Sequence, residues 1–445
     1  MCKRFFCILL ILTVLLCGAT MPLCASAQLF NPDFTLTAEH VLVINLNTGT
    51  EVYSLNADES LFPASTTKIM TAILTIENCE NTDVMVTATK SALSNVELSS
   101  SVAGIVEGEI LSVKDLLGML LVRSGSDAAY VLAEYIGGSV SNFINMMNDR
   151  ATELKCTGTS FVNPTGMHNA EHYSTARDMG IIACHALTLP LFAELFGMKE
   201  YTTADTNMSD AHFYTTTNFL IDLNRGGSSY YKYATGGKTG FTTPAGRCLI
   251  STAQKGDTQY LSLVFGCRTD SGSSETLAFT DTVKIFDWCF DSLKLQKIAS
   301  LDVPIDEVSL KYAWNHDYVT LSPTADMYAV LPDDKTVDDL TKTTTVPESL
   351  DAPVKKGDYA GTVTYSYDGV VLSTGKLEVY ESVDRNLLVY IIAKVSEFFK
   401  STAALILLGV VLILLAVYLF IRVAIRSKAR SSYKRRKRYR RYKRY

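Results

Sequence analysis

The sequence has few of the residues that build metal centres. Only six of its 445 residues are histidines, and none of its ten cysteines belongs to a CxxC pair. His168 and His172 are four residues apart, as two ligands on one helical face can be, but they lie in a Pro- and Gly-containing stretch without an acidic partner motif. The sequence therefore predicts neither a metal site nor a cofactor.

Two C-terminal segments lack charge of one or both signs. Residues 403–421 contain no charged side chain, and a helix of that length spans about 28 Å, close to the hydrocarbon thickness of a bilayer. Residues 422–445 contain thirteen Lys or Arg and no Asp or Glu. Because basic residues stay on the cytoplasmic side of a membrane helix, we expect a single-pass transmembrane helix at 403–421, a cytoplasmic tail at 422–445, and an extracytoplasmic chain before them.

The residues around this helix have more than one interpretation. Residues 434–444 interleave basic side chains with tyrosine, as nucleic-acid-binding arms do, but a stop-transfer signal that contacts anionic lipid explains them more simply. We therefore expect a membrane lipid partner and no nucleic acid. Residues 386–402 alternate apolar groups with charges, and we expect a juxtamembrane helix at the outer interface.

The N-terminus has the order of a secretory signal peptide at 1–27. Basic residues precede an apolar run, and Ala25-Ser26-Ala27 supplies small residues before a cut at Gln28. A first transmembrane helix is the alternative, but the apolar run is shorter than the roughly 20 residues that a bilayer needs. Six cysteines remain after the cut, and their spacing leaves disulfides and buried thiols equally open.

The rest of the chain changes character near residue 295. Before it, at 28–292, strand signals mix with helical spacing of apolar residues, as in an α/β domain. Strands are expected at 40–46, 51–55, 249–253 and 260–266, and helices at 66–79, 113–122, 127–137, 140–154 and 275–290. Helical periodicity then disappears, and short β-type runs at 318–321, 327–331 and 361–367 predict a small all-β domain over 295–383.

The first candidate for chemistry is Ser65 with Lys68 one helical turn later. A lysine near a helix N-terminus lies in positive potential, which disfavours its protonated form. A neutral amine can take the proton of a serine hydroxyl, and the N–H groups of the helix start can hold an oxyanion. The spacing alone is weak evidence, since Ser-x-x-Lys recurs at Ser229, Ser373 and Ser431.

Two further motifs, at 124–126 and 238–240, follow Ser65 along the chain. Lys238-Thr239-Gly240 reads as a strand whose Lys and Thr bind a carboxylate, while Gly lets a substrate backbone lie alongside. Ser124-Gly125-Ser126 lies between two predicted helices, where a second serine can relay a proton. Taken alone, that segment is better explained as a helix N-cap followed by Asp127.

With their order and spacing, these motifs resemble those of penicillin-interacting serine enzymes. The chain is similar to the low-molecular-mass penicillin-binding proteins that act as D-alanyl-D-alanine carboxypeptidases, members of the penicillin-binding/β-lactamase-like superfamily. The similarity covers about 38–290 and includes an all-β module through 353–358. It is carried by 62–72, 127–129, 163–167, 173–178, 238–242 and 245–246.

The resemblance implies an antiparallel sheet flanked by helices, and a role for each motif. Ser65 is the acylated nucleophile, Lys68 its base, and Ser124 assists proton transfer. Lys238 and Thr239 hold the terminal carboxylate of the peptide, and Gly240 lies beside it. The backbone N–H groups of Ser65 and Phe241 form the oxyanion hole. The implied partners are peptidoglycan stem peptides ending in D-Ala-D-Ala, with β-lactam antibiotics as covalent inhibitors.

The chain departs from the family at Ser126, where Asn is usual. A hydroxyl is shorter than an amide and offers fewer groups to a bound peptide. This departure keeps open a non-catalytic peptidoglycan-binding protein of the same fold. A β-lactamase is the other alternative, but no matching loop with a water-activating Glu is evident between Ser126 and Lys238. Arg268 follows a late strand and is a further candidate for the substrate carboxylate.

Overall fold

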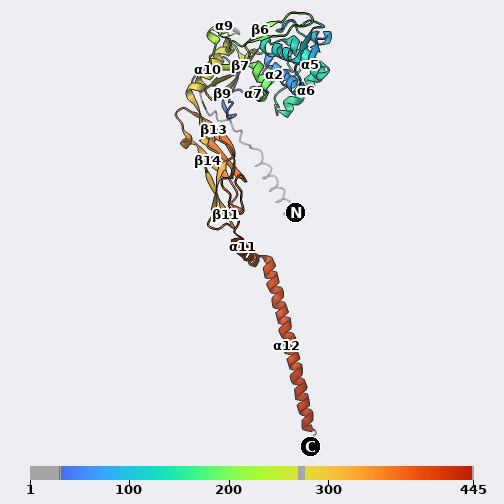
Figure 1. The fold of residues 1–445 in the computed structure, drawn as a ribbon, viewed down its shortest axis with the longest axis vertical. Helices are drawn as coiled ribbons and strands as arrows, with labels where there is room; N and C mark the ends of the chain where they lie inside the picture. The colour runs from blue at the N-terminus through green and yellow to red at the C-terminus, as the bar shows by residue number, and fades with distance from the viewer. Residues whose placement is uncertain (1–29, 31, 269–275, 443–445) are drawn as a thin grey trace, which may run out of the picture. The chain divides into compact units, whose positions relative to one another are not determined.

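The computed structural model describes residue 30 and residues 32–268 and 276–442 of the chain (Figure 1). The predicted signal peptide at 1–27 lies outside these residues. Along the described chain, a mixed α/β part is followed by an all-β part and by two C-terminal helices. The predicted fold class is therefore confirmed.

The α/β part is built on a five-stranded antiparallel sheet with the order β2-β1-β9-β8-β7. The strands predicted at 40–46 and 51–55 and both late strands are confirmed, and the late strands are longer than expected. The strands are β1 His40–Asn45, β2 Glu51–Leu55, β7 Ala234–Thr242, β8 Gly246–Lys255 and β9 Thr258–Cys267. Because β7 is the last strand of this order, it forms one edge of the sheet.

Both faces of the sheet are covered by hydrophobic side chains. In β1, Val41 and Val43 belong to one buried cluster and Leu42 to another, as the alternation of a strand requires. The first cluster packs under α10 (Leu277–Ser292), and the second under α7 (Ala176–Leu187) and α2 (Lys68–Glu77). Figure 1 shows α10 on one side of the strands and α2 on the other.

The predicted helices are present, with one change of type. The helix expected at 113–122 starts as α4 (Val113–Gly118) and continues as a π-helix, η2 (Met119–Arg123), which ends at Ser124. Helices α7 and α8 (Pro190–Phe196) were not predicted. The other elements of this part are η1 Ala64–Thr67, β3 Met85–Thr87, α3 Lys90–Leu93, β4 Ile110–Ser112, α5 Ser126–Gly137, α6 Val140–Glu153, β5 Glu200–Thr202, β6 Phe213–Thr215, α9 Leu223–Gly226 and η3 Gly227–Ser229.

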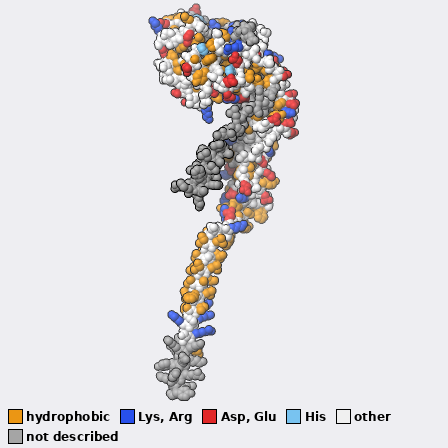
Figure 2. Space-filling view, turned by 180° about the vertical axis from the view of Figure 1, so that it is seen from behind, with side chains coloured by type: hydrophobic (Ala, Val, Ile, Leu, Met, Phe, Trp, Pro, Cys, Tyr) orange, Lys and Arg blue, Asp and Glu red, His pale blue; other side chains and the backbone are white. Residues whose placement is uncertain are grey.

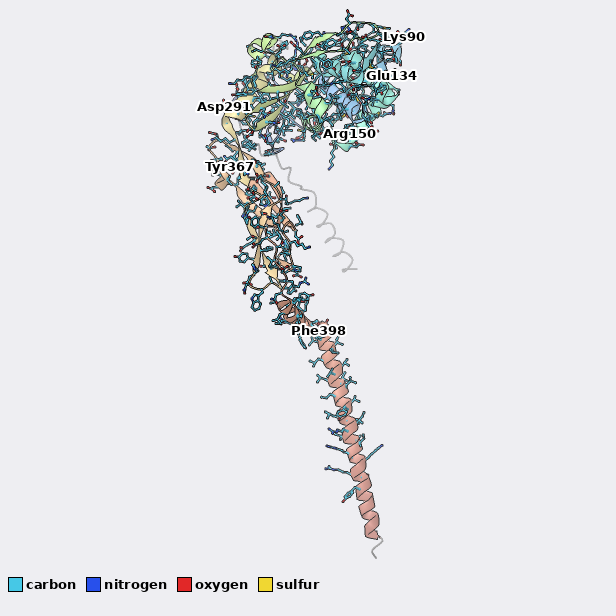
Figure 3. The ribbon with its side chains drawn as sticks, in the orientation of Figure 1. Lys90, Glu134, Arg150, Asp291, Tyr367 and Phe398 are labelled. Atoms are coloured by element: carbon cyan, nitrogen blue, oxygen red, sulfur yellow. The ribbon has the colours of Figure 1, made fainter. Side chains whose placement is uncertain are left out.

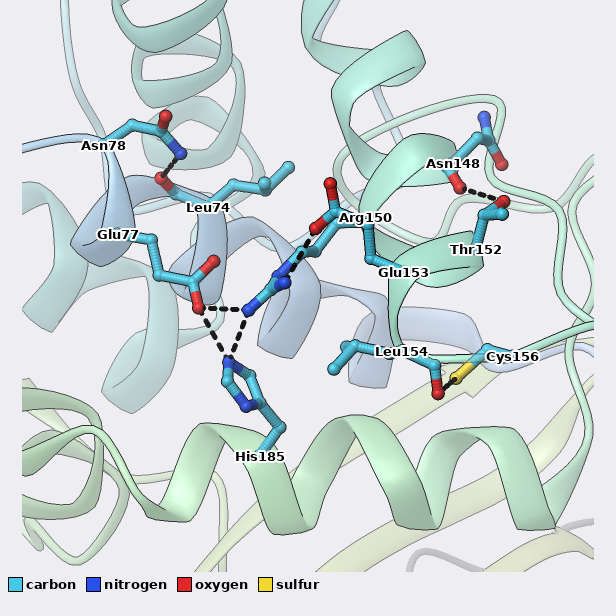
Figure 4. A network of polar contacts seen from close by, with 10 residues as sticks. All are labelled: Leu74, Glu77, Asn78, Asn148, Arg150, Thr152, Glu153, Leu154, Cys156 and His185. Carbon is cyan, nitrogen blue, oxygen red and sulfur yellow. Dashed lines mark hydrogen bonds and ion pairs between the residues drawn. The ribbon is translucent and has the colours of Figure 1, made fainter.

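A small ion-pair network ties the C-terminal end of α2 to its neighbours (Figure 4). Glu77 Oε1 lies 2.6 Å from Arg150 Nη2 of α6 and 2.7 Å from His185 Nε2 of α7. Arg150 also contacts Glu153 at 2.8 Å. The network joins three helices, so it helps to fix the helix whose other end carries Lys68.

The six cysteines outside the predicted signal peptide are free thiols. Cys184 is half-buried, and Cys79, Cys156, Cys248, Cys267 and Cys289 are buried. The structure therefore favours buried thiols, one of the two interpretations that the spacing left open. Burial also raises the pKa of the Cys248 thiol to about 12, so it is not a reactive thiolate.

The all-β part confirms the predicted change of character. A six-stranded sheet has the order β14-β16-β17-β12-β11-β15, and β10 pairs with β13. The three predicted β-type runs lie in β12, β13 and β16. The elements are β10 Leu293–Ala299, β11 Asp306–Lys311, β12 Tyr318–Pro323, β13 Met327–Pro332, η4 Val337–Asp339, β14 Thr341–Thr345, β15 Ser349–Asp351, β16 Tyr359–Tyr367 and β17 Val370–Val379.

Two helices end the described chain, α11 (Leu387–Lys400) and α12 (Thr402–Tyr442). The part of α12 from Thr402 to Lys428 is long and apolar enough to cross a membrane. Figure 2 shows hydrophobic side chains along this part, followed by basic ones. The expected apolar helix at 403–421 and the expected juxtamembrane helix are therefore both present as helices.

Candidate active site

The predicted nucleophile lies at the start of a helix. Ser65 belongs to the short helix η1, which leads directly into α2, and its side chain is partly exposed. Lys68 Nζ donates to Ser65 Oγ at 3.0 Å, as the spacing of three residues predicts. Ala64 has a φ of 48°, a conformation that is costly for a non-glycine residue and is often found at functional sites.

Lys68 is buried, and its environment favours the neutral amine. Its side chain is 1% exposed, and Nζ also donates to the carbonyl of Thr165 at 2.9 Å. Burial lowers the pKa of Lys68 to about 7, although the nearby carboxylates of Glu97 and Asp127 act in the opposite direction. A substantial fraction of Lys68 is therefore neutral near pH 7 and able to accept a proton.

A second lysine–serine pair lies beside the first. Lys238 Nζ donates to Ser124 Oγ at 2.8 Å and to the carbonyl of Thr239 at 2.9 Å. Burial and the neighbouring Lys68 lower the pKa of Lys238 well below its usual value. Ser124 follows the π-helix and has a φ of 66°, so an unusual backbone directs its hydroxyl toward Lys238.

These side chains meet at one pocket. Six of the eight predicted site residues line it, and Lys68 and Lys238 lie buried behind their serines. The lining residues are Ser65, Ser99, Ser100, Ser101, Ser124, Ser126, Met167, Thr217, Thr239, Gly240, Phe241, Arg247, Cys248, Ala278 and Phe279. The structure thus brings together residues that the sequence separates by more than a hundred positions.

Edge strand β7 forms the wall beside Ser65. A Cβ atom on Gly240 would lie 3.1 Å from the backbone nitrogen of Ser65, so this close approach favours glycine. The neighbouring hydroxyls of Thr239 and Thr217 are 2.6 Å apart. The edge of the strand therefore presents backbone groups and hydroxyls next to the nucleophile.

The opposite wall is held by α5. Ser126 is its first residue, and its backbone N–H donates to the carbonyl of Ser101 at 2.8 Å. The carboxylate of Asp127 accepts the backbone N–H of Ala103 at 2.9 Å and of Gly104 at 2.7 Å. This carboxylate fixes the serine-rich loop.

The segment 163–167 supports Lys68 from behind. Asn163 Oδ1 accepts the backbone N–H of Gly166 at 2.7 Å, which closes a tight turn. This turn presents the Thr165 carbonyl to Lys68, and the carbonyl of Pro164 accepts Thr71 Oγ1 at 2.7 Å. The turn therefore helps to position Lys68 through backbone carbonyl groups, and it contains no charged side chain.

Two residues weighed from the sequence lie elsewhere. Arg268 does not line the pocket; its Nε lies 3.2 Å from Glu39 Oε1 and it donates to the carbonyl of Pro244 at 3.0 Å. His172 is buried, accepts the backbone N–H of Val162 at 3.1 Å and lies 2.8 Å from Thr67 Oγ1. Burial lowers the pKa of His172 to about 4, so this neutral ring is a structural contact behind η1.

Several pocket residues were missed from the sequence. Arg247 and Thr217 line the pocket, and the serine loop at 99–101 forms part of its wall. The position of Arg247 could have been predicted from the sequence, because a tight turn after the Lys238 strand pairs residue 247 with Phe241 on the next strand. The loop at 99–101 could not have been predicted to line the pocket, since its position depends on contacts with Asp127, more than twenty residues later.

The arrangement is suited to acyl transfer through serine. The partly exposed hydroxyl of Ser65 contacts one buried amine, the hydroxyl of Ser124 contacts a second one, and edge strand β7 passes close to Ser65. These are the parts that a serine nucleophile requires. The side chains that line the pocket in the described part of the chain include no carboxylate.

Comparisons with known proteins agree with this chemistry. The D-alanyl-D-alanine carboxypeptidase family matches residues 26–269, and the C-terminal domain of penicillin-binding protein 5 matches residues 294–385. A D-alanyl-D-alanine carboxypeptidase of Haemophilus influenzae, DacA, is 30% identical over 78% of this chain and 86% of its own length. DacF of Bacillus subtilis is 28% identical over the same shares.

Solved structures give the same result. Penicillin-binding protein 5 from Haemophilus influenzae has a TM-score of 0.67 and 27% identity, over 80% of this chain and all of its own. The Streptomyces K15 DD-transpeptidase has a TM-score of 0.53 and 31% identity, over 59% of this chain and all of its own. The family match, which spans more than half of the sequence, shows that the chain belongs to the D-alanyl-D-alanine carboxypeptidase family of serine peptidases.

Proposed function

We propose that the chain is a serine D-Ala-D-Ala carboxypeptidase that removes the terminal D-alanine from peptidoglycan stem peptides. The observation that carries the proposal is the 3.0 Å contact between buried Lys68 and pocket-lining Ser65. Family membership supports the reaction class, and relatives at 28–30% identity carry the name D-alanyl-D-alanine carboxypeptidase.

Acylation starts when Ser65 Oγ attacks the carbonyl carbon of the penultimate D-Ala and passes its proton to Lys68 Nζ. The backbone N–H groups of Ser65 and Phe241 stabilise the oxyanion of the tetrahedral intermediate. When the C–N bond breaks, the leaving amine takes a proton from the Ser124 hydroxyl. The proton that Lys68 took from Ser65 then passes to the Ser124 oxygen, which leaves Lys68 neutral, and free D-alanine departs.

Deacylation uses the same base. Lys68, neutral again, takes a proton from a water molecule, and the resulting hydroxide attacks the Ser65 ester. The oxyanion hole acts a second time, and Ser65 recovers its proton as the shortened peptide leaves. No step requires a metal or a cofactor.

The pocket favours this reaction over the two alternatives. A class A β-lactamase needs a carboxylate to activate the deacylating water, and none lines the described pocket, so penicillin should form a long-lived ester with Ser65. A non-catalytic binding protein does not require a buried base in contact with its serine. Ser126 lines the pocket, which supports a contact between its side chain and the peptide.

The proposal is tested by D-alanine release from a synthetic peptide ending in Lys-D-Ala-D-Ala, with the full-length protein in detergent. We expect release by the wild type and none by Ser65→Ala. Ser373→Ala is the matched control, because Ser373 has the same Ser-x-x-Lys spacing but lies in β17. Release by Ser65→Ala, or none by the wild type, would refute the assignment, and rapid turnover of penicillin would favour the β-lactamase.

We infer that α12 crosses the membrane once, with the tail at 422–445 in the cytoplasm and the pocket outside the cell. Its apolar length and the basic residues after it support this orientation. Helix α11 ends at Lys400, two residues before α12 begins, so it lies at the outer interface. Its exposed apolar residues are Leu387, Leu388, Ile391, Ile392, Val395, Phe398 and Phe399.

The other face of α11 contacts the all-β part. Tyr312 OH donates to Glu397 Oε1 at 3.2 Å, and the rings of Tyr312 and Tyr390 meet edge to face at 5.1 Å. Lys394 lies 5.3 Å from the centre of the Tyr312 ring. With its polar face occupied, α11 turns its apolar face, including Phe398 in Figure 3, toward lipid.

The membrane arrangement predicts the result of a protease-protection experiment. In intact spheroplasts that express the protein with a tag after Tyr445, external protease should degrade the pocket-bearing part and leave the tag protected. A chain ended after residue 385 should be released from the membrane fraction. Digestion of the tag in intact spheroplasts, or membrane retention of the shortened chain, would contradict the arrangement.

A further inference from the structure

The proposed substrate brings a negative charge into the pocket. A peptide that ends in D-Ala-D-Ala carries a terminal carboxylate on the residue that leaves, and burying an unpaired carboxylate is costly. A positively charged partner is therefore expected near the leaving group. The two active-site lysines do not provide it, because their Nζ atoms are engaged with serines and carbonyls and burial favours their neutral forms.

Arg247 is the one charged side chain among the described residues that line the pocket. It lies on β8 directly opposite Phe241 of β7. Phe241 directly follows Gly240, the glycine that packs closely against Ser65. The guanidinium carbon of Arg247 is 4.0 Å from the centre of the Phe241 ring. A guanidinium stays charged at all working pH values, and an aromatic face holds it in a fixed orientation.

The guanidinium also has unused hydrogen-bonding capacity. Arg247 Nε is buried and has no hydrogen-bond partner within the described chain. A buried donor without a partner is unusual in a native structure and points to a missing ligand. Arg268, the other arginine of this region, is already paired with Glu39 and lies outside the pocket lining.

We propose that Arg247 binds the terminal carboxylate of the substrate, with the hydroxyls of Thr239 and Thr217 beside it. This inference rests on the proposed carboxypeptidase function and identifies a specificity residue for it. A planar guanidinium pairs with a carboxylate through two parallel hydrogen bonds. Lys238 then serves Ser124 in proton transfer and not the substrate carboxylate, the role that sequence resemblance implied for it.

The test compares two peptide thioesters with the same D-alanyl acyl group. One has a leaving thiol that carries a carboxylate, and the other carries the corresponding amide. Both acylate Ser65 by the same chemistry, so the ratio of their kcat/KM values isolates recognition of the carboxylate. The proteins are the full-length wild type, Arg247→Gln, Arg247→Lys and the control Arg268→Gln.

We expect the wild type and Arg268→Gln to prefer the carboxylate thioester. Arg247→Gln should lose about 10- to 100-fold in kcat/KM for it, mostly through KM, as loss of a charge-assisted hydrogen bond predicts. Its rate with the amide thioester should stay within about threefold of the wild type, which also shows that it is folded. Arg247→Lys should recover part of the preference.

Three outcomes would overturn the inference. Arg247→Gln with an unchanged carboxylate preference would show that another group binds the carboxylate. Equal loss with both thioesters would show a structural role for Arg247. If the wild type reacts with neither thioester, the proposed function itself fails, which is distinguishable because the failure does not depend on residue 247.

Discussion

Replacing Lys68 with methionine is expected to slow acylation of Ser65 by about 10²- to 10⁴-fold, the usual contribution of a general base. The reason is that, in the proposed mechanism, Lys68 Nζ accepts the proton of the attacking Ser65 hydroxyl, which lies 3.0 Å away. The pKa of Lys68 is lowered to about 7, so the neutral base predominates above that pH. Wild-type acylation should therefore fall as pH decreases below about 7 and level off above it.

The measurement is the rate at which fluorescent penicillin labels the protein between pH 5.5 and 9. Lys68→Arg is the matched variant, because arginine keeps a long cationic side chain but is not a base at these pH values. It should be nearly as slow as Lys68→Met throughout. If Lys68→Arg labels within a few-fold of the wild type, Lys68 positions Ser65 and another group is the base.

The part of the site that could be predicted from sequence is local. Ser65 and Lys68 are three residues apart at the start of a helix, so helical geometry alone places one near the other. The strand that carries Lys238, Thr239 and Gly240 was also expected, and its register with β8 is regular over these residues. Four strands and most helices of this part follow from apolar periodicity in the same way, whereas the antiparallel sheet was implied by the family resemblance.

The contacts between distant segments could not be predicted from periodicity. Lys238 meets Ser124 across 114 positions of sequence, and the geometry depends on a π-helix that ends with Ser124 in a left-handed conformation. Periodicity gives a helix at 113–122 but does not distinguish α from π. Burial of both lysines, which sets their protonation, likewise appears only when the pocket is assembled.

Replacing Gly166 with alanine is the second change expected to have a large effect. Gly166 has a φ of +82°, and a Cβ atom there would lie 1.8 Å from the carbonyl oxygen of Ala64, the residue before the nucleophile. The left-handed backbone costs alanine about 1–2 kcal/mol, and overpacking costs about 1–3 kcal/mol more. Because the turn at 163–167 also presents the Thr165 carbonyl to Lys68, labelling by fluorescent penicillin should be lost together with stability.

Gly49→Ala separates the two causes. Gly49 has a φ of +73° in the turn between β1 and β2, but nothing lies within 4 Å of its added Cβ. It should therefore cost only the backbone penalty of about 1–2 kcal/mol in urea denaturation and label with penicillin at the wild-type rate. If Gly166→Ala behaves like Gly49→Ala in both measurements, η1 tolerates displacement. The close packing of Gly166 against Ala64 would then not be what holds Ser65 in place.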